Sequence, residues 1–212
     1  MPAFRHLRRS TVLSAVFAVL TAPLVAAGAH AGLAADQEAS VQKLIERGAI
    51  EEAVQKAASE PDRAESTFLA AQALMKIDNH GGASERFARL RDACDAAWKA
   101  IGESGAALIE GNAGAAMEAA NRAVSANGDN PYAHYQIGVV ASRQANFQRA
   151  AEAYERSADL KPDLAYAHYY AALAYQRVKQ IPKMAEHFQA FLRLAPEAPE
   201  RQAVQALLRS LR

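Results

Sequence analysis

The sequence predicts an all-α protein built from stacked helix pairs, and three observations support that fold class. The tetrapeptide YAHY at residues 132–135 returns at residues 166–169, an offset of 34. Apolar residues along the chain recur at helical spacing. The composition is 51% hydrophobic but only 7% aromatic, and much of the apolar fraction is alanine, the residue with the highest helix propensity.

The repeated units resemble the tetratricopeptide repeat (TPR), a 34-residue helix–turn–helix unit that stacks into a solenoid. A small residue, Gly138 or Ala172, stands where the first helix of such a unit passes close to the second. A proline, Pro162 or Pro196, closes each unit. The resemblance implies a right-handed α-solenoid that ends in a capping helix.

Stepping along the chain by this period divides it into five units and a terminal helix. We expect a partial unit at 36–62, full units at 64–95, 97–130, 131–164 and 165–198, and the capping helix at 199–212. The capping helix has one apolar face, which suits it to cover the last repeat. The third unit is rich in glycine, and each glycine inside a helix costs roughly 1 kcal/mol. We therefore expect it to be the loosest part of the array.

Residues 1–31 have the pattern of an export signal. We expect one domain at 32–212. Three arginines precede an apolar run from Val12 to Ala27, and the small-residue site Ala29-His30-Ala31 follows. This order is the secretory pattern, and the run is too short and too rich in alanine to compete well as a membrane span. An uncleaved anchor is the alternative. The general secretory route is favoured over the twin-arginine route, and the periplasm over full secretion.

Charge and cysteine content narrow the classes of partner. The formal net charge is +1, and the first 35 residues hold three arginines and no acid, so the rest of the chain carries −2. A nearly neutral chain does not favour nucleic acid. Cys94 is the only cysteine, so no internal disulfide and no cysteine-based zinc site can form. We expect no cofactor, no metal and, after signal cleavage, no membrane association.

The resemblance also implies where a partner would bind. In this family the first helix of each unit lines a concave groove, and the helical spacing of residues 132, 135, 139 and 143 puts them on one face. The predicted groove residues are Trp98 in the third unit, Tyr132, Tyr135, Val139 and Arg143 in the fourth, and Tyr166, Tyr169, Leu173 and Arg177 in the fifth. Aromatic rings beside arginines are common anchors of protein interfaces.

Packing is the competing interpretation of several of these residues. The tyrosines can fill space between repeats, since such stripes are often core. His134 and His168 hold a position that usually packs between helices, with a pH- or metal-responsive role as the alternative. Apolar Val139 and Leu173 replace the asparagine with which some family members bind a peptide carboxylate, so an apolar or aromatic segment, or a partner helix, fits this groove better.

No enzymatic motif is present. The chain lacks a GxSxG nucleophile elbow, an HExxH zinc motif and a GxGxxG phosphate loop. The sequence therefore predicts a non-catalytic adaptor of the cell envelope that binds a protein or peptide, for assembly of an envelope, secretion or pilus complex. The alternatives are a self-associating structural array, a homo-oligomer, and a chaperone-like factor in cytochrome maturation.

Overall fold

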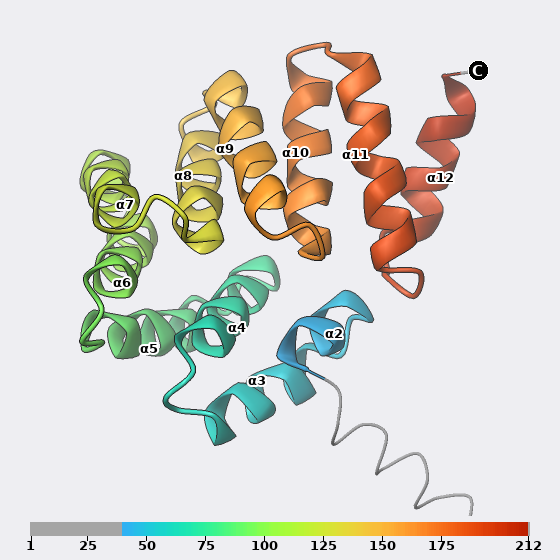
Figure 1. Ribbon diagram of the computed structural model, residues 1–212. Coiled ribbons are helices and arrows are strands. Elements are labelled where there is room, and N and C mark those ends of the chain that lie inside the picture. The colour runs from blue at the N-terminus through green and yellow to red at the C-terminus, as the bar shows by residue number, and fades with distance from the viewer. Residues whose placement is uncertain (1–39, 212) are drawn as a thin grey trace, which may run out of the picture. The chain divides into compact units, whose positions relative to one another are not determined.

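The computed structural model describes residues 40–211, which lie within one compact unit, Ala39–Arg212. The predicted export signal at 1–31 lies outside the described residues. All regular secondary structure between residues 40 and 211 is helical, which confirms the predicted all-α solenoid (Figure 1). In this part of the chain no helix has the length and apolar character that a membrane crossing needs.

Ten of the eleven described helices form five pairs, and the last stands alone. The pairs are α2 (Val41–Glu46) with α3 (Ile50–Ser59), α4 (Ala64–Lys76) with α5 (His80–Arg91), α6 (Ala96–Ile109) with α7 (Ala113–Ala126), α8 (Pro131–Arg143) with α9 (Phe147–Leu160), and α10 (Ala165–Arg177) with α11 (Ile181–Leu194). The single helix is α12 (Arg201–Ser210). Helix α2 is short, with six residues, and ends before Gly48.

The same backbone turn joins the two helices of every pair. One residue with positive φ comes two positions before the second helix, and these residues are Gly48, Asp78, Gly111, Ala145 and Lys179. In three pairs the next residue is an asparagine whose side chain accepts a hydrogen bond from the amide three residues on, at 3.0–3.2 Å. Such a cap satisfies a backbone donor that the helix leaves open. The repeat is therefore defined by its turns as well as by its apolar faces.

Glycine inside the first helices permits close approach of the second. A Cβ atom on Gly138 would lie 2.7 Å from the ring of Tyr154 on α9, which confirms the small-residue prediction for this position. A Cβ atom on Gly105 would lie 2.2 Å from the ring of Phe87, and one on Gly102 would lie 2.7 Å from the Phe87 carbonyl oxygen. Gly102 and Gly105, two of the glycines of the third unit, therefore stand where α6 packs closely against α5.

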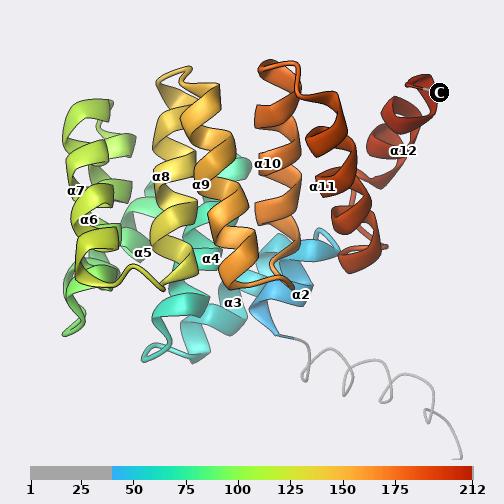
Figure 2. The same cartoon turned by 45° about the horizontal axis from the view of Figure 1, so that its top comes forward.

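The row of helix pairs curves so that its beginning faces its end. Helices α2–α5 lie opposite α8–α11 in Figure 1, and the turned view of Figure 2 keeps that arrangement. Direct contacts agree with the pictures. Gln42 of α2 donates a hydrogen bond to the Asp163 carbonyl oxygen before α10, at 2.6 Å, and a Cβ atom on Gly48 would lie 2.9 Å from Pro199.

Candidate functional site

The first helices of the pairs face the inside of the curve, where their aromatic rings meet. Phe68 of α4 reaches across to α8 and contacts two tyrosines edge-on, with ring centroids 5.4 Å from Tyr132 and 5.7 Å from Tyr135. Trp98 of α6 lies beside Tyr132 at 5.4 Å. Tyr135 in turn contacts Tyr170 of α10 edge-on, with ring centroids 6.0 Å apart. Aromatic side chains of neighbouring first helices therefore touch along the inside of the curve, and α4 packs against them.

Polar side chains hold α4 in this place. Glu65 accepts a hydrogen bond from the Tyr132 hydroxyl. At the other end of α4, the Lys76 ammonium group forms an ion pair with Glu200, and it also lies 3.0 Å from the Tyr166 hydroxyl. The same hydroxyl donates to Glu200 at 3.1 Å. Charge-assisted bonds of this kind are the stronger ones in proteins, so both ends of α4 are fixed across the curve.

A buried polar chain crosses the middle of the same interface. The Gln72 amide donates to Gln136 at 3.0 Å, Gln136 donates to the Ser104 hydroxyl at 3.0 Å, and Ser104 donates to the Ala116 carbonyl at 2.8 Å. Gln136 and Ser104 have no exposed surface. Because an unpaired buried amide costs about 1–3 kcal/mol, this chain of bonds favours one register of α4 against α8.

Little space is left between the N-terminal helices and the concave face. A cavity of about 30 Å³ at this interface is bordered by α2, α4, α8 and α10, with Glu46, Lys76 and Tyr166 among its lining residues. That is room for one or two water molecules. In this conformation the chain's own helices fill the inner part of the groove.

The predicted groove residues divide into a covered and an open group. Tyr132, Tyr135 and Tyr166 are buried, at 4%, 4% and 7% exposure, while Trp98 and Tyr169 are half-buried. Burial, together with the hydrogen bond to Glu65, raises the pKa of the Tyr132 hydroxyl far above its usual value. Tyr132, Tyr135 and Tyr166 act here as core between α4, α8 and α10, which is the packing interpretation. Trp98 of α6 packs beside Tyr132, and Tyr169 packs on Phe191 of α11. Their contact with a partner stays a prediction.

The open group lies toward the C-terminal ends of α8 and α10. Val139 and Leu173 are half-buried, and Arg143 and Arg177 are exposed. The Arg177 guanidinium lies 4.3 Å from the centre of the Phe147 ring, a cation–π contact that holds the charge in position. Each residue of one unit stands 34 positions from its counterpart in the next, so the open surface repeats an apolar side chain followed by an arginine.

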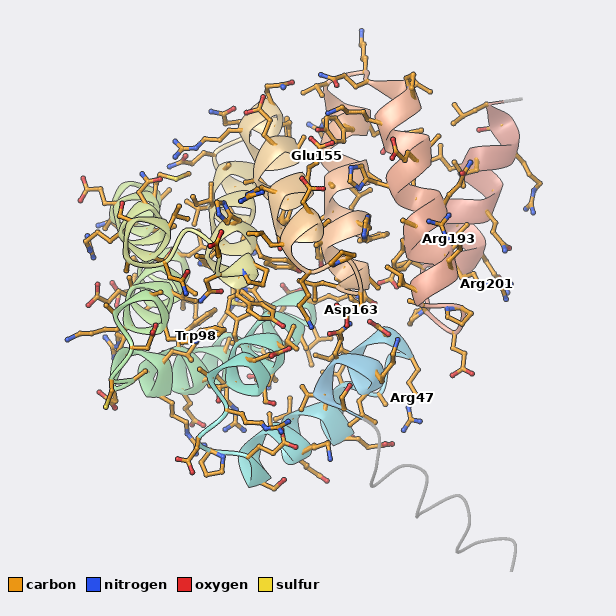
Figure 3. All side chains as sticks on the ribbon, in the orientation of Figure 1. Arg47, Trp98, Glu155, Asp163, Arg193 and Arg201 are labelled. Carbon is orange, nitrogen blue, oxygen red and sulfur yellow. The ribbon has the colours of Figure 1, made fainter. Side chains whose placement is uncertain are left out.

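Sequence reasoning did not identify the residues that close the groove. Lys76 and Glu200 are 124 positions apart, and Tyr132 and Glu65 are 67 apart, so neither pair follows the 34-residue period. Figure 3 shows Asp163 at the end of α10 that α2 approaches, and Trp98 between α6 and α4. The sequence feature that indicates a covered face is the large number of aromatic residues on the first helices, because large aromatic side chains are mostly buried.

Solved structures that are similar to this chain include TPR proteins. The Arabidopsis OM64 TPR domain has a TM-score of 0.51 and 17% identity, over 55% of this chain and 97% of that one. TTC0263, a thermophilic TPR protein in Thermus thermophilus, has a TM-score of 0.53 and 16% identity, over 76% and 88%. MamA protein has a TM-score of 0.46 and 23% identity, over 69% and 81%. No protein-family model and no curated protein sequence matches the chain. At these identities the likeness to the first two, whose TM-scores exceed 0.5, shows the fold alone, which is the TPR solenoid.

Proposed function

We propose that this TPR solenoid is a non-catalytic scaffold of the cell envelope that binds a protein or peptide segment on the open part of its concave face. One observation carries the proposal: the arginines Arg143 and Arg177 are exposed beside half-buried Val139 and Leu173. The repeat places the same pair of side chains on two neighbouring first helices. A partner bound there contacts a surface that folding has already ordered, so little conformational entropy is lost on the receptor side.

The chemistry of this surface points to the class of partner. Arginine forms bidentate hydrogen bonds with carboxylates, and the apolar residue one helical turn before it can take an aliphatic or aromatic side chain. An extended segment that alternates apolar and acidic residues fits two such pairs. The tyrosines deeper in the groove do not take part unless α4 moves, because Glu65, Phe68 and Lys76 cover them.

A comparison of captured proteins tests this surface. Wild-type chain and the double variant Arg143→Ala/Arg177→Ala are used as bait in an envelope extract, and the captured proteins are quantified. The control is Arg122→Ala, which removes an exposed arginine on α7 that pairs with Glu103. We expect at least one protein to be lost with the double variant and retained with the control. Equal capture by all three chains would contradict the proposed surface.

The envelope assignment rests on the sequence pattern of residues 1–31 and needs its own test. Fractionation of cells that express the full-length chain should place it in the periplasm, and its N-terminal sequence should begin at Gly32. A chain that stays in the cytoplasm with its N-terminus intact would remove the envelope from the proposal. Light scattering of the purified chain distinguishes an adaptor from a self-associating array. A self-associating array should give the mass of a dimer or a larger assembly.

A further inference from the structure

The single helix α12 stands where a sixth helix pair would begin. It follows α11 at the end of the row in both ribbon views (Figures 1 and 2). Pro199, just before α12, lies two 34-residue periods after Pro131, the first residue of α8. In the repeat register α12 is therefore the first helix of a unit, and residues 40–211 contain no second helix to pair with it. Val204 is the one residue of α12 that is buried.

An open groove runs between α11 and α12. Its volume is about 570 Å³, within the range of about 300–1,000 Å³ that is usual for binding sites in proteins. Both helices contribute side chains to it: Ala185, Gln189 and Leu192 from α11, and Gln205, Leu208 and Arg209 from α12.

The preceding unit shows what fills such a groove. Glu155 of α9 and Tyr175 of α10 stand one period before Gln189 and Arg209. The second helix of that unit, α11, packs on both of them. The Lys183 ammonium group of α11 lies 2.9 Å from Glu155 Oε1 and 3.1 Å from the Tyr175 hydroxyl oxygen. The groove between α11 and α12 is therefore the space that a helix occupies one unit earlier.

The apolar floor of the groove has lost its cover in comparison with the preceding unit. Ala158 of α9 and Ala174 of α10 are buried, whereas Leu192 and Leu208, one period later, are only half-buried. Removing such apolar surface from water is favourable. A helix that lies between α11 and α12 would bury both leucines.

The charge of the groove indicates which kind of helix fits. The Glu155 carboxylate of the preceding unit is replaced by the neutral Gln189, and the Tyr175 hydroxyl by the guanidinium of Arg209. Arg209 is exposed, and it has no acidic partner in the described part of the chain. A lysine at the place of Lys183 would be repelled by Arg209, whereas a carboxylate would form a charge-assisted pair with it.

Further unpaired arginines stand at the other end of the groove, where α11 leads into α12. Arg193 and Arg201 are exposed, and Figure 3 labels both. The exposed acids of this region, Glu186 and Glu197, form no ion pair with them within residues 40–211. Acidic side chains on a bound helix therefore have partners at both ends of the groove.

We propose that the groove between α11 and α12 binds an acidic amphipathic helix of a partner protein, which completes a sixth repeat with α12 as its first helix. Recognition of a helix in a groove uses apolar anchors at i, i+4 and i+7. Helix α11 supplies such anchors to its own contacts as Met184, Phe188 and Phe191, each at most 1% exposed. The partner helix has an apolar stripe of the same spacing and an Asp or Glu where α11 has Lys183. This site lies apart from the concave face and does not depend on the proposed function.

Peptide binding to the full chain tests the groove. The probe is a synthetic peptide with the sequence of residues 181–194 and the change Lys183→Glu, held helical by a lactam between positions 189 and 193, which are exposed in α11. The control peptide keeps the lysine. We expect fluorescence anisotropy to show roughly fivefold tighter binding of the acidic peptide by the wild type, since an exposed ion pair is worth up to about 1 kcal/mol.

A charge-reversed variant makes the test specific to the groove. Arg209 is exposed, so Arg209→Glu leaves the packing of α12 in place, and circular dichroism checks the fold. The preference should reverse, with the lysine peptide bound more tightly than the acidic one. Two controls should keep the wild-type preference: Arg122→Glu, the same change on α7, and Arg143→Ala/Arg177→Ala on the concave face.

Three results would overturn the proposal. The first is that the wild type binds neither peptide, or that folded Arg209→Glu keeps the wild-type preference. The second is a loss of binding in Arg143→Ala/Arg177→Ala while Arg209→Glu still binds, which would place the peptide on the concave face. The third is a wild-type dimer in light scattering that Arg209→Glu converts to a monomer, which would assign the groove to a second copy of this chain.

Discussion

At the scale of single residues, glycine determines how closely α5 and α6 approach. Gly105→Ala would place a methyl group 2.2 Å from the ring of Phe87, which is 1% exposed and cannot move into solvent. Overpacking of this kind costs about 1–3 kcal/mol, and the better helix propensity of alanine offsets less than about 1 kcal/mol of that. We expect a net loss of roughly 1–2 kcal/mol in the free energy of unfolding, measured by urea denaturation. Gly114→Ala is the control, because its Cβ would meet nothing closer than 3.7 Å. Equal stability of the two variants would show that α5 can move aside.

Backbone conformation also affects the stability of the fold at the scale of single residues. Gly111 has a φ of 79°, and a Cβ atom there would have no neighbour within 4 Å, so Gly111→Ala measures strain alone. The left-handed conformation costs an L-residue about 1–2 kcal/mol, and we expect a loss of about 1 kcal/mol. Ala145 holds the same turn position with a φ of 56°, so Ala145→Gly should be neutral or stabilising. Thermal unfolding of both variants gives the comparison, and a change of the same sign in both would contradict it.

At the scale of helices, the 34-residue repeat in the sequence was enough to predict the all-α solenoid. The YAHY tetrapeptides at residues 132–135 and 166–169 lie in the first turns of α8 and α10, which begin 34 residues apart. The inner surface was only partly predictable. The spacing of its aromatic residues predicts one shared helix face, but a helix face does not reveal whether a partner or a distant helix of the same chain covers it. The contact between His168 of α10 and His187 of α11 escaped prediction because His187 has no counterpart in the fourth unit.

Helices α9, α10 and α11 are joined by the Glu155 carboxylate, which predicts an acid-sensitive contribution to stability. Burial raises the pKa of Glu155, but hydrogen bonds from Tyr175 and Lys183 outweigh it, so the folded-state pKa lies below the ordinary 4.5. A lowered pKa means that the ionised form stabilises the fold, fully above the unfolded-state pKa and progressively less as the pH falls through the folded value. Glu155→Gln should therefore be less stable than the wild type at pH 7, and the difference should shrink toward pH 3.

Urea denaturation at several pH values measures this difference. The control is Glu118→Gln, an exposed glutamate on α7, which should change the free energy of unfolding by less than about 0.5 kcal/mol at any pH. A Glu155→Gln deficit that stays constant from pH 7 to pH 3 would show that the loss comes from shape and packing, because a contribution from the ionised carboxylate must decrease once the pH falls below the unfolded-state pKa.

At the scale of the whole described unit, a few contacts far apart in sequence keep the concave face closed. An open solenoid needs only neighbouring repeats to contact each other. Here α4 of the second pair also contacts α8 through the Phe68 cluster and the start of α12 through the Lys76–Glu200 pair. The accessible groove is consequently shorter than the number of repeats implies, and its length depends on whether α4 stays docked.

The Lys76–Glu200 pair offers a direct test of that closure. Its side chains are 29% and 15% exposed, between the surface and the interior. Lys76→Glu puts two carboxylates in contact, and we expect a loss of roughly 1–3 kcal/mol in stability, intermediate between exposed and buried ion pairs. Small-angle X-ray scattering should show a larger radius of gyration as the N-terminal pairs separate from α10. The swapped variant Lys76→Glu/Glu200→Lys restores opposite charges, and either partner can still bond with the Tyr166 hydroxyl, so it should regain most of the compactness. If Lys76→Glu keeps the wild-type scattering curve, the aromatic cluster alone closes the groove, and a partner would then have to displace Phe68 to reach the inner tyrosines.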